Sequence, residues 1–320
     1  MSGPILHAWL LSGLGLGILL LGGDLLVRGA VNLSLRLGVP ALIVSLTIVA
    51  FGTSAPELLI SIKAVMDGLP GIALGNVIGS NTANILLVLG LPAMMATLHT
   101  SECNTRRTYQ FMILSSLLFI ALATRDVFDK LAGLLLLGAL VVVLTDAFRT
   151  ARRHQRAGEH DDLEDIDEAD PDMPYWRIAL YLLLGLIALP VGANLLIEYA
   201  SQIARTYGIS DAVIGLTLVA LGTSLPELAT TVMAVLRRQA DVALGNVIGS
   251  NIFNLLGIIG VASLVGPIRV DPEFLEFDLW VMLAVSLLLI PFVYFGRDIT
   301  RRWGVVLTVL YVVYILAILK

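Results

Sequence analysis

The chain has 320 residues, of which 58% are hydrophobic and 14% are charged, and its formal net charge is −5. Soluble domains carry about a quarter charged residues, so this composition excludes an ordinary soluble protein and indicates a chain that crosses a membrane many times. The single cysteine, Cys103, excludes an intrachain disulfide, and the four scattered histidines do not suggest a zinc centre.

Apolar runs long enough to cross a hydrocarbon core of about 30 Å predict ten membrane helices. In chain order they are residues 5–27, 41–66, 71–97, 109–124, 130–147, 176–202, 211–236, 242–265, 278–295 and 303–319. The first run has no basic segment before it and no small-residue cleavage pattern, so we expect a retained span and not a signal peptide. The expected fold class is an all-α polytopic membrane protein.

Lys and Arg residues orient the predicted spans, because they are enriched in cytoplasmic segments. With the N-terminus outside, six of the 20 basic residues are external, and the other fourteen are cytoplasmic. The external ones are Lys63, Arg125, Lys130, Arg205, Arg269 and Lys320. We therefore expect a protein of the plasma (inner) membrane with both termini outside.

One long hydrophilic stretch, 149–174, separates the predicted halves 1–148 and 175–320. Residues 149–172 hold four arginines and nine acidic residues, which accounts for the net charge of −5. The acidic run could be a calcium sensor, but it lacks the central glycine of an EF-hand loop and a flanking helix pair. We expect a solvated cytoplasmic linker.

The two halves repeat each other at an offset of 170 residues. The sequence ALGNVIGSN occurs at 73–81 and at 243–251, and GTSAPE at 52–57 is matched by GTSLPE at 222–227. Because each predicted half has an odd number of spans, the second half enters the membrane from the opposite side. This predicts two inverted five-helix repeats, an arrangement typical of secondary transporters that bind their substrate near the membrane midplane.

Each copy of the GTS-x-PE motif puts polar residues on one face of a helix, since residues three and four apart share a face. These residues are Ala50, Thr53, Ser54 and Glu57 in the first copy and Ala220, Thr223, Ser224 and Glu227 in the second. Pro56 and Pro226 lack an N–H, so the carbonyls of Gly52 and Gly222 lose their helical donors and the helix is expected to kink. A free carbonyl within a membrane needs another partner, and a cation would supply one.

The span after each motif adds amides and hydroxyls at intervals of four residues. They are Asn76, Ser80 and Asn84 in the first half and Asn246, Ser250 and Asn254 in the second. Oxygen ligands without sulfur or imidazole suit hard cations such as Na⁺ or Ca²⁺. Glu57 and Glu227 together carry a charge of −2, which one Ca²⁺ or two Na⁺ would neutralise, and carboxylates inside a membrane usually mark ion pathways.

Other interpretations remain open for single residues. A hydroxyl in a membrane helix often bonds only its own helix, and a buried glutamate could pair with a basic side chain. Lys63 is the only basic residue of the second, third, seventh and eighth spans, and it lies near a span end. An intramembrane hydrolase would need a base for Ser54 or Ser80, and no His or Lys is placed to serve as one.

Five further polar residues are candidates for packing or for lining an ion path. Asn81 and Asn251 are either packing amides or ion ligands. Asp24 has Asn194 as its counterpart in the second half, which argues against a direct role in ion binding. Thr47 and Thr217 lie one helical turn before the stripe, and we expect them to line the ion path.

At these motifs the chain resembles the cation/Ca²⁺ exchanger superfamily, whose best-known members are sodium/calcium exchangers. The resemblance rests on GTSAPE with GNVIGSNTAN in one half and GTSLPE with GNVIGSNIFN in the other, and it extends over the ten-span arrangement. It implies Na⁺/Ca²⁺ antiport by alternating access, in which spans one and six slide across a core of spans two, three, seven and eight. It also implies Glu57 and Glu227 as central carboxylates, with further oxygens from Thr53, Ser54, Ser80, Thr223, Ser224 and Ser250, from the carbonyls of Ala50 and Ala220, and from the side chains of Asn84 and Asn254.

Several members of that superfamily have an aspartate at one of the positions matched by Asn84 and Asn254. Both positions are asparagine here, and the missing acidic residue weakens the case for K⁺-dependent exchange. Ca²⁺/H⁺ exchange on the same glutamates is the main alternative, and a passive cation channel is another. We expect no enzymatic activity, no cofactor, no nucleic acid and no obligate protein partner. The expected partners are inorganic cations and the lipid bilayer.

Overall fold

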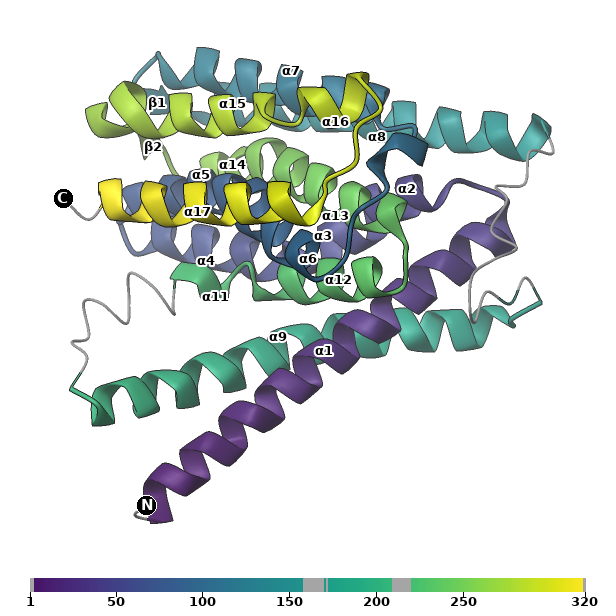
Figure 1. Cartoon of the computed structure of the whole chain (residues 1–320). Coiled ribbons are helices and arrows are strands. Elements are labelled where there is room, and N and C mark those ends of the chain that lie inside the picture. The colour runs from purple at the N-terminus through teal and green to yellow at the C-terminus, as the bar shows by residue number, and fades with distance from the viewer. Residues whose placement is uncertain (1–2, 158–169, 171, 209–219, 319–320) are drawn as a thin grey trace.

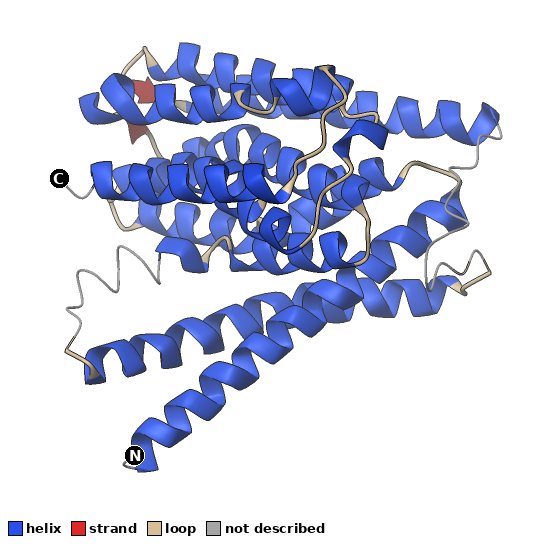
Figure 2. Cartoon of the chain, viewed as in Figure 1, coloured by secondary structure: helices blue, strands red, loops and turns tan. Residues whose placement is uncertain are grey.

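The structure is a computed structural model that describes residues 3–157, 170, 172–208 and 220–318. Helices make up almost all of it, and the strands are confined to one short pair (Figure 2). The long helices α1 (Gly3–Leu37) and α9 (Tyr175–Thr206) pack against each other along one side of the molecule, and the remaining helices form a stack beside them (Figure 1).

Two runs of helices carry the repeated sequence. The first half contains α2 (Ala41–Val44), η1 (Ser45–Val49), α3 (Ala50–Thr53), α4 (Ala55–Met66), α5 (Pro70–Ala83), η2 (Asn84–Val88), α6 (Gly90–Met95), η3 (Thr100–Glu102), α7 (Arg106–Ala123), β1 (Val127–Phe128) and α8 (Lys130–Ala157). The second half contains α11 (Ala220–Gly222), α12 (Leu225–Leu236), α13 (Ala240–Ile252), η5 (Phe253–Ile258), α14 (Ile259–Val265), β2 (Ile268–Arg269), η6 (Phe274–Asp278), α15 (Leu279–Leu287), α16 (Ile290–Tyr294) and α17 (Arg301–Ile318). The segments η1, η2, η5 and η6 are wider π-helical turns within longer helices.

The structure supports a polytopic membrane protein. Within the described residues, seven helices are long and apolar enough to cross a membrane, and the bent pair 41–53 and 55–66 makes an eighth. Two predicted spans are not among these eight. The span predicted at 109–124 corresponds to α7, which begins with Arg106 and Arg107. The span predicted at 211–236 contains α12, which is 12 residues long, and residues 211–219 lie outside the described residues. Two boundaries differ clearly from expectation. Helix α1 continues ten residues past its predicted end, to Leu37, and α8 continues to Ala157, so the first part of the predicted linker is helical.

Glycines bring α1 and α9 into backbone contact. A Cβ atom at Gly15 would lie 2.6 Å from the amide nitrogen of Leu196, and one at Gly192 would lie 2.8 Å from the carbonyl oxygen of Gly15. On the other side of α1, a Cβ at Gly23 would lie 2.8 Å from the carbonyl oxygen of Ala229 in α12. The glycine-rich start of the chain therefore serves close helix packing, which small residues permit in membranes.

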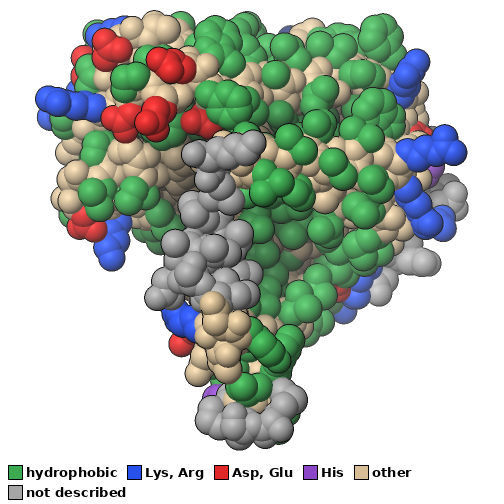
Figure 3. Space-filling view, turned by 60° about the vertical axis from the view of Figure 1, so that its left-hand side comes forward, with side chains coloured by type: hydrophobic (Ala, Val, Ile, Leu, Met, Phe, Trp, Pro, Cys, Tyr) green, Lys and Arg blue, Asp and Glu red, His purple; other side chains and the backbone are tan. Residues whose placement is uncertain are grey.

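The two ends of the helix stack differ in charge. One end carries the antiparallel β1–β2 pair, and we call it the β end; the opposite end carries the start of α7 and the end of α8, and we call it the arginine end (Figure 1). Figure 3 shows acidic side chains gathered at one edge of the visible face, mainly basic ones at the opposite edge, and an apolar surface between them. Such a band is expected of a surface in contact with lipid.

Candidate functional site

Both motif helices break at the serine before the proline. Ser54 and Ser224 have φ of −83° and −87° with ψ of 4°, so each leaves the α-helical conformation, and the axis bends by 44° between residues 41–53 and 55–66. A proline is tolerated in the first turn of a helix, which is where Pro56 lies in α4. The predicted kink is therefore confirmed, and it leaves Glu57 and Glu227 in the first turns of α4 and α12, each only 1% exposed.

An asparagine from the following helix holds the backbone at each glutamate. The side-chain amide of Asn76 donates to the carbonyl oxygen of Glu57 at 3.3 Å and to the hydroxyl of Ser61 at 3.1 Å. In the second half, Asn246 donates in the same way to the carbonyl oxygen of Glu227 at 3.3 Å and to Thr231 at 3.2 Å. These two asparagines have a positioning role that their spacing alone did not reveal.

Four asparagines form a reciprocal seam between the two halves. The Asn81 amide donates to the backbone carbonyl of Asn251 at 3.2 Å, and Asn251 donates to that of Asn81 at 3.3 Å. The side-chain oxygens of the same two residues accept from Asn254 and Asn84, each at 3.0 Å. Asn81 and Asn251 thus act as packing amides. Their side-chain oxygens hold the amide groups of Asn254 and Asn84 in place, and the side-chain oxygens of Asn84 and Asn254 remain unpaired.

Two cross-links join the motifs into one buried cluster. The hydroxyl of Ser54 donates to Oε1 of Glu227 at 3.2 Å, and the hydroxyl of Thr53 donates to Oδ1 of Asn246 at 3.3 Å. The equivalent bonds from Thr223 and Ser224 to the first half are absent from the described residues. The cluster is therefore asymmetric, although the sequence around it repeats.

Six side-chain oxygens of this cluster are buried without any hydrogen-bond partner in the part of the chain that the structure describes. They are Oε2 of Glu57, Oε2 of Glu227, Oδ1 of Asn84, Oδ1 of Asn254, Oγ1 of Thr223 and Oγ of Ser250. Buried polar atoms in folded proteins are nearly always paired, so such a concentration needs an explanation. All six belong to the residues singled out from the sequence.

A cavity of about 450 Å³ reaches this cluster from the β end. Its lining includes Asn76, Ser80 and Thr223 from the cluster, and also Gly75 and Gly79 of α5. A Cβ atom at Gly79 would meet no described atom within 4 Å. The cavity therefore borders the cluster on the side of the β end.

The same positions in the second half are closed. A Cβ at Gly249 would lie 2.6 Å from the carbonyl oxygen of Leu46 and from Cβ of Ala50, and the hydroxyl of Ser45 donates to the carbonyl oxygen of Val242 at 2.7 Å. A cavity of about 650 Å³ at the arginine end extends only to Leu46. The segment η1–α3, packed on α13, therefore separates the cluster from the arginine end.

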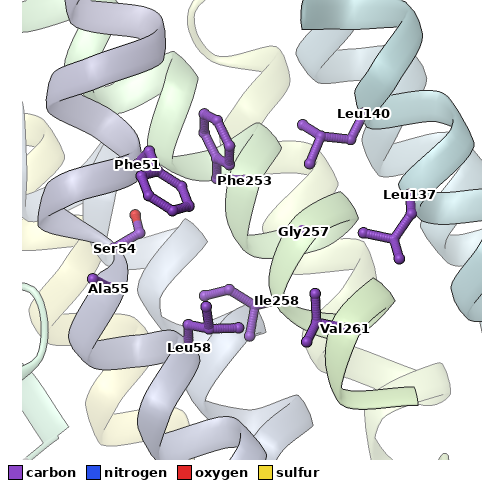
Figure 4. A pocket seen from close by; sticks show the side chains of 10 residues that line it. All are labelled: Phe51, Ser54, Ala55, Leu58, Leu137, Leu140, Phe253, Gly257, Ile258 and Val261. Atoms are coloured by element: carbon purple, nitrogen blue, oxygen red, sulfur yellow. The ribbon is translucent and has the colours of Figure 1, made fainter. Parts of the chain in front are cut away.

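A smaller cavity of about 100 Å³ lies beside Ser54, between the motif helix, η5–α14 and α8 (Figure 4). Apart from the Ser54 hydroxyl, the side chains in Figure 4 are apolar, among them Phe51, Phe253 and Leu137. A space of this kind offers no set of oxygen ligands. It is therefore not part of the candidate cation site.

The remaining sequence candidates are placed as follows. The carbonyl oxygen of Ala50 already accepts a bond from the Ser54 amide at 3.1 Å, and it lies 3.3 Å from the Thr53 hydroxyl. Asp24 pairs with Arg28 at 2.9 Å and with Arg237 at 2.5 Å, outside the cluster. Ala220 begins α11, Thr47 bonds its own helix at the carbonyl of Ile43, and Thr217 lies outside the described residues.

Comparison with known proteins identifies close relatives. The profile of a family described as sodium/calcium exchanger protein matches residues 7–148 and 177–320. The sodium/calcium exchanger MaX1 of Methanosarcina acetivorans is 34% identical, with 95% of this chain and 96% of that protein aligned, and the putative antiporter CaxA of Alkalimonas amylolytica is 37% identical over 94% and 95%. A solved structure of the sodium-calcium exchanger NCX_Mj, soaked with Na⁺ and Sr²⁺, is similar with a TM-score of 0.81, 33% identity and 98% coverage of both chains.

Proposed function

The chain belongs to the sodium/calcium exchanger family, and on that premise we propose that it exchanges Na⁺ for Ca²⁺ across the membrane by alternating access. Relatives with an exchanger name and a structural neighbour that covers nearly the whole chain support this function. The fold we propose for it is ten spans in two inverted five-helix repeats. Helices in every predicted range and reciprocal bonds between residues 170 positions apart support that fold.

The observation that carries the proposal is the set of six unpaired, buried oxygens around Glu57 and Glu227. An unsatisfied buried polar atom costs about 1–3 kcal/mol, and more when it is charged. A cation coordinated by these oxygens would remove that cost. Hydroxyl, amide and carboxylate oxygens are the ligands that Na⁺ and Ca²⁺ prefer.

In this proposal the ions bind between the halves. Glu57 and Glu227 are the shared carboxylates, and the other ligands are Thr53, Ser54, Ser80, Asn84, Thr223, Ser224, Ser250 and Asn254. Within the described residues no group of three or more Asp, Glu, His or Cys side chains is placed to hold a metal, so the negative charge of the site comes from this pair. Because Na⁺ and Ca²⁺ need the same two carboxylates, they compete, and competition couples the entry of one to the exit of the other.

The direction of access follows from charge. The bias of Lys and Arg residues assigns the β end to the outside and the arginine end, with the linker, to the cytoplasm. The open cavity at the β end and the closed packing of Gly249 on η1–α3 then correspond to a conformation open to the outside. Transport would require the reverse arrangement in the other conformation.

Flux through proteoliposomes tests the proposal. Vesicles loaded with Na⁺ are expected to take up ⁴⁵Ca²⁺, and Glu57→Gln or Glu227→Gln should lower the rate at least about tenfold, because an interaction with a charged group is worth about 1.5–3 kcal/mol and 1.4 kcal/mol is tenfold. Glu276→Gln is the matched control, since Glu276 is exposed outside the cluster. Full activity in both glutamate variants would overturn the site, and uptake that follows a pH gradient and ignores Na⁺ would identify Ca²⁺/H⁺ exchange instead.

A further inference from the structure

The cavity at the β end has a single charged residue among the described residues that line it. Asp278, the last residue of η6, shares this wall with Tyr311 and Tyr314 of α17, and the opposite wall belongs to α5. In the stack, α15 packs on α5, and α17 packs on α6 and on η2, which continues from α5 (Figure 1). A carboxylate is thus positioned in the passage that leads to the glutamate cluster.

Asp278 is not neutralised by its neighbours. The hydroxyl of Tyr314 donates to its Oδ1 at 3.2 Å, and Tyr314 carries no charge to offset it. No ion pair joins Asp278 to a Lys, Arg or His side chain within the residues that the structure describes. Its partner therefore fixes one carboxylate oxygen and leaves the negative charge facing the cavity.

The inner end of the same cavity is formed by ligands of the proposed ion site. Ser80 is 5% exposed and its hydroxyl makes no hydrogen bond to a described residue, and Oγ1 of Thr223 is buried and unpaired. Asn76, one helical turn before Ser80 in α5, also lines the cavity, and its amide is committed to Glu57 and Ser61. One continuous space thus joins the Asp278 carboxylate to two unpaired hydroxyls.

The pseudo-equivalent position in the other half has no charge. The offset of 170 residues relates Asp278 to Thr108, which lines the cavity at the arginine end together with Arg106 and Arg107. Arg107 pairs there with Asp146. The acidic group in the β-end cavity is therefore not a consequence of the repeat.

We propose that Asp278, with the Tyr314 hydroxyl, forms an outer cation station at which Ca²⁺ or Na⁺ is held before it passes to Ser80 and Thr223. This inference rests on the proposed exchange function. A cleft with one sign of charge raises the local concentration of counter-ions, and rates of association rise by about 10- to 1,000-fold in such fields. Asp278 acts on the capture of the ion and not on the change of conformation.

Sided transport kinetics separate the charge of Asp278 from its hydrogen bond. Asp278→Asn keeps an oxygen to accept from Tyr314 but removes the charge, so KM for external Ca²⁺ should rise about tenfold, the low end of the field effect, while the maximal rate stays within about twofold. Tyr314→Phe removes the bond and keeps the charge, so it should change KM less than about threefold. Asp278→Glu should restore KM, and Glu276→Gln, on the exposed face of the same segment, should resemble wild type.

Binding of Tb³⁺ to the purified protein gives a readout without transport. In the Glu57→Gln/Glu227→Gln background, Tb³⁺ luminescence excited through tyrosine should persist, and adding Asp278→Asn should abolish it. Unchanged KM and luminescence in Asp278→Asn, or equal effects of Asp278→Asn and Tyr314→Phe, would overturn the station. If the wild type shows no Na⁺-driven uptake but Tb³⁺ luminescence still depends on Asp278, the exchange function is overturned and the outer cation station is not.

Discussion

Two glycines at equivalent positions provide the sharpest test of the closed arginine end. Gly79 and Gly249 are 170 residues apart in identical sequence, yet Gly79 faces the β-end cavity and Gly249 is packed on η1–α3. A methyl group at position 249 would lie 2.6 Å from a backbone oxygen and from the Ala50 methyl, closer than atoms can approach. We therefore expect Gly249→Ala to weaken this contact and Gly79→Ala to leave it intact.

The magnitude follows from the cost of overpacking. Extra methyl groups in a well-packed interior cost about 1–3 kcal/mol. If that cost falls on the conformation closed at the arginine end, the equilibrium shifts toward opening there by about 5- to 150-fold. Both substitutions replace a helical glycine by alanine, so the gain in helix propensity, up to about 1 kcal/mol, is the same and cancels in the comparison.

Accessibility of a cysteine measures the shift. Ser250→Cys in a Cys103→Ser background places a thiol beside Gly249, at a position that is fully buried. Labelling by a membrane-impermeant reagent from the cytoplasmic side should accelerate about 5- to 150-fold with Gly249→Ala and stay within about twofold with Gly79→Ala. Equal labelling in the two variants would refute the assignment of a closed arginine end.

Three further outcomes are expected. Asn251→Ala removes the hydrogen bonds of the seam to Asn81 and Asn84. The thermal midpoint of the purified protein should therefore fall by the equivalent of about 1–3 kcal/mol for each buried group left unpaired. Asn104 is exposed, so Asn104→Ala should leave the midpoint unchanged. Asp24→Asn should lower the thermal midpoint but keep KM for Ca²⁺ within about twofold, because Asp24 pairs with Arg28 and Arg237 away from the site; a KM change as large as that of Glu57→Gln would contradict this placement. Burial raises the pKa of Asp298, but hydrogen bonds from Ser101 and the nearby His99 outweigh this effect and hold the pKa below the usual 3.8. The stabilisation that Asp298→Asn removes should therefore be present above about pH 4 and disappear as the pH falls below that value. A difference in thermal midpoint between wild type and Asp298→Asn that grows in acid would contradict this.

The sequence predicted the helical ranges and the breaks at the motif because both depend on local chemistry. Apolar length predicts helices in a membrane, and Pro56 cannot donate in a helix, so the bend at Ser54 follows from the residues alone. The grouping of Glu57 with Glu227 was expected from the predicted inverted repeat, which would bring the two motifs together between the halves.

The asymmetry between the halves could not be predicted. Gly79 and Gly249 lie in the same nine-residue sequence, and only the conformation of the whole molecule decides which of them is covered. The choice between packing and ligand roles for Asn81 also depended on contacts 170 residues away. No motif in the sequence marks Asp278, because only the folded chain brings it and Ser80 into the lining of one cavity.

We propose that Na⁺ and Ca²⁺ compete for one buried oxygen site and thereby exchange. The most direct measurement is ⁴⁵Ca²⁺ uptake into proteoliposomes under an outward gradient of Na⁺, of K⁺ or of H⁺ in turn. We expect uptake under the Na⁺ gradient alone, and we expect this uptake to stop when external Na⁺ equals internal Na⁺. Uptake of equal rate under all three gradients, or with no gradient, would contradict it.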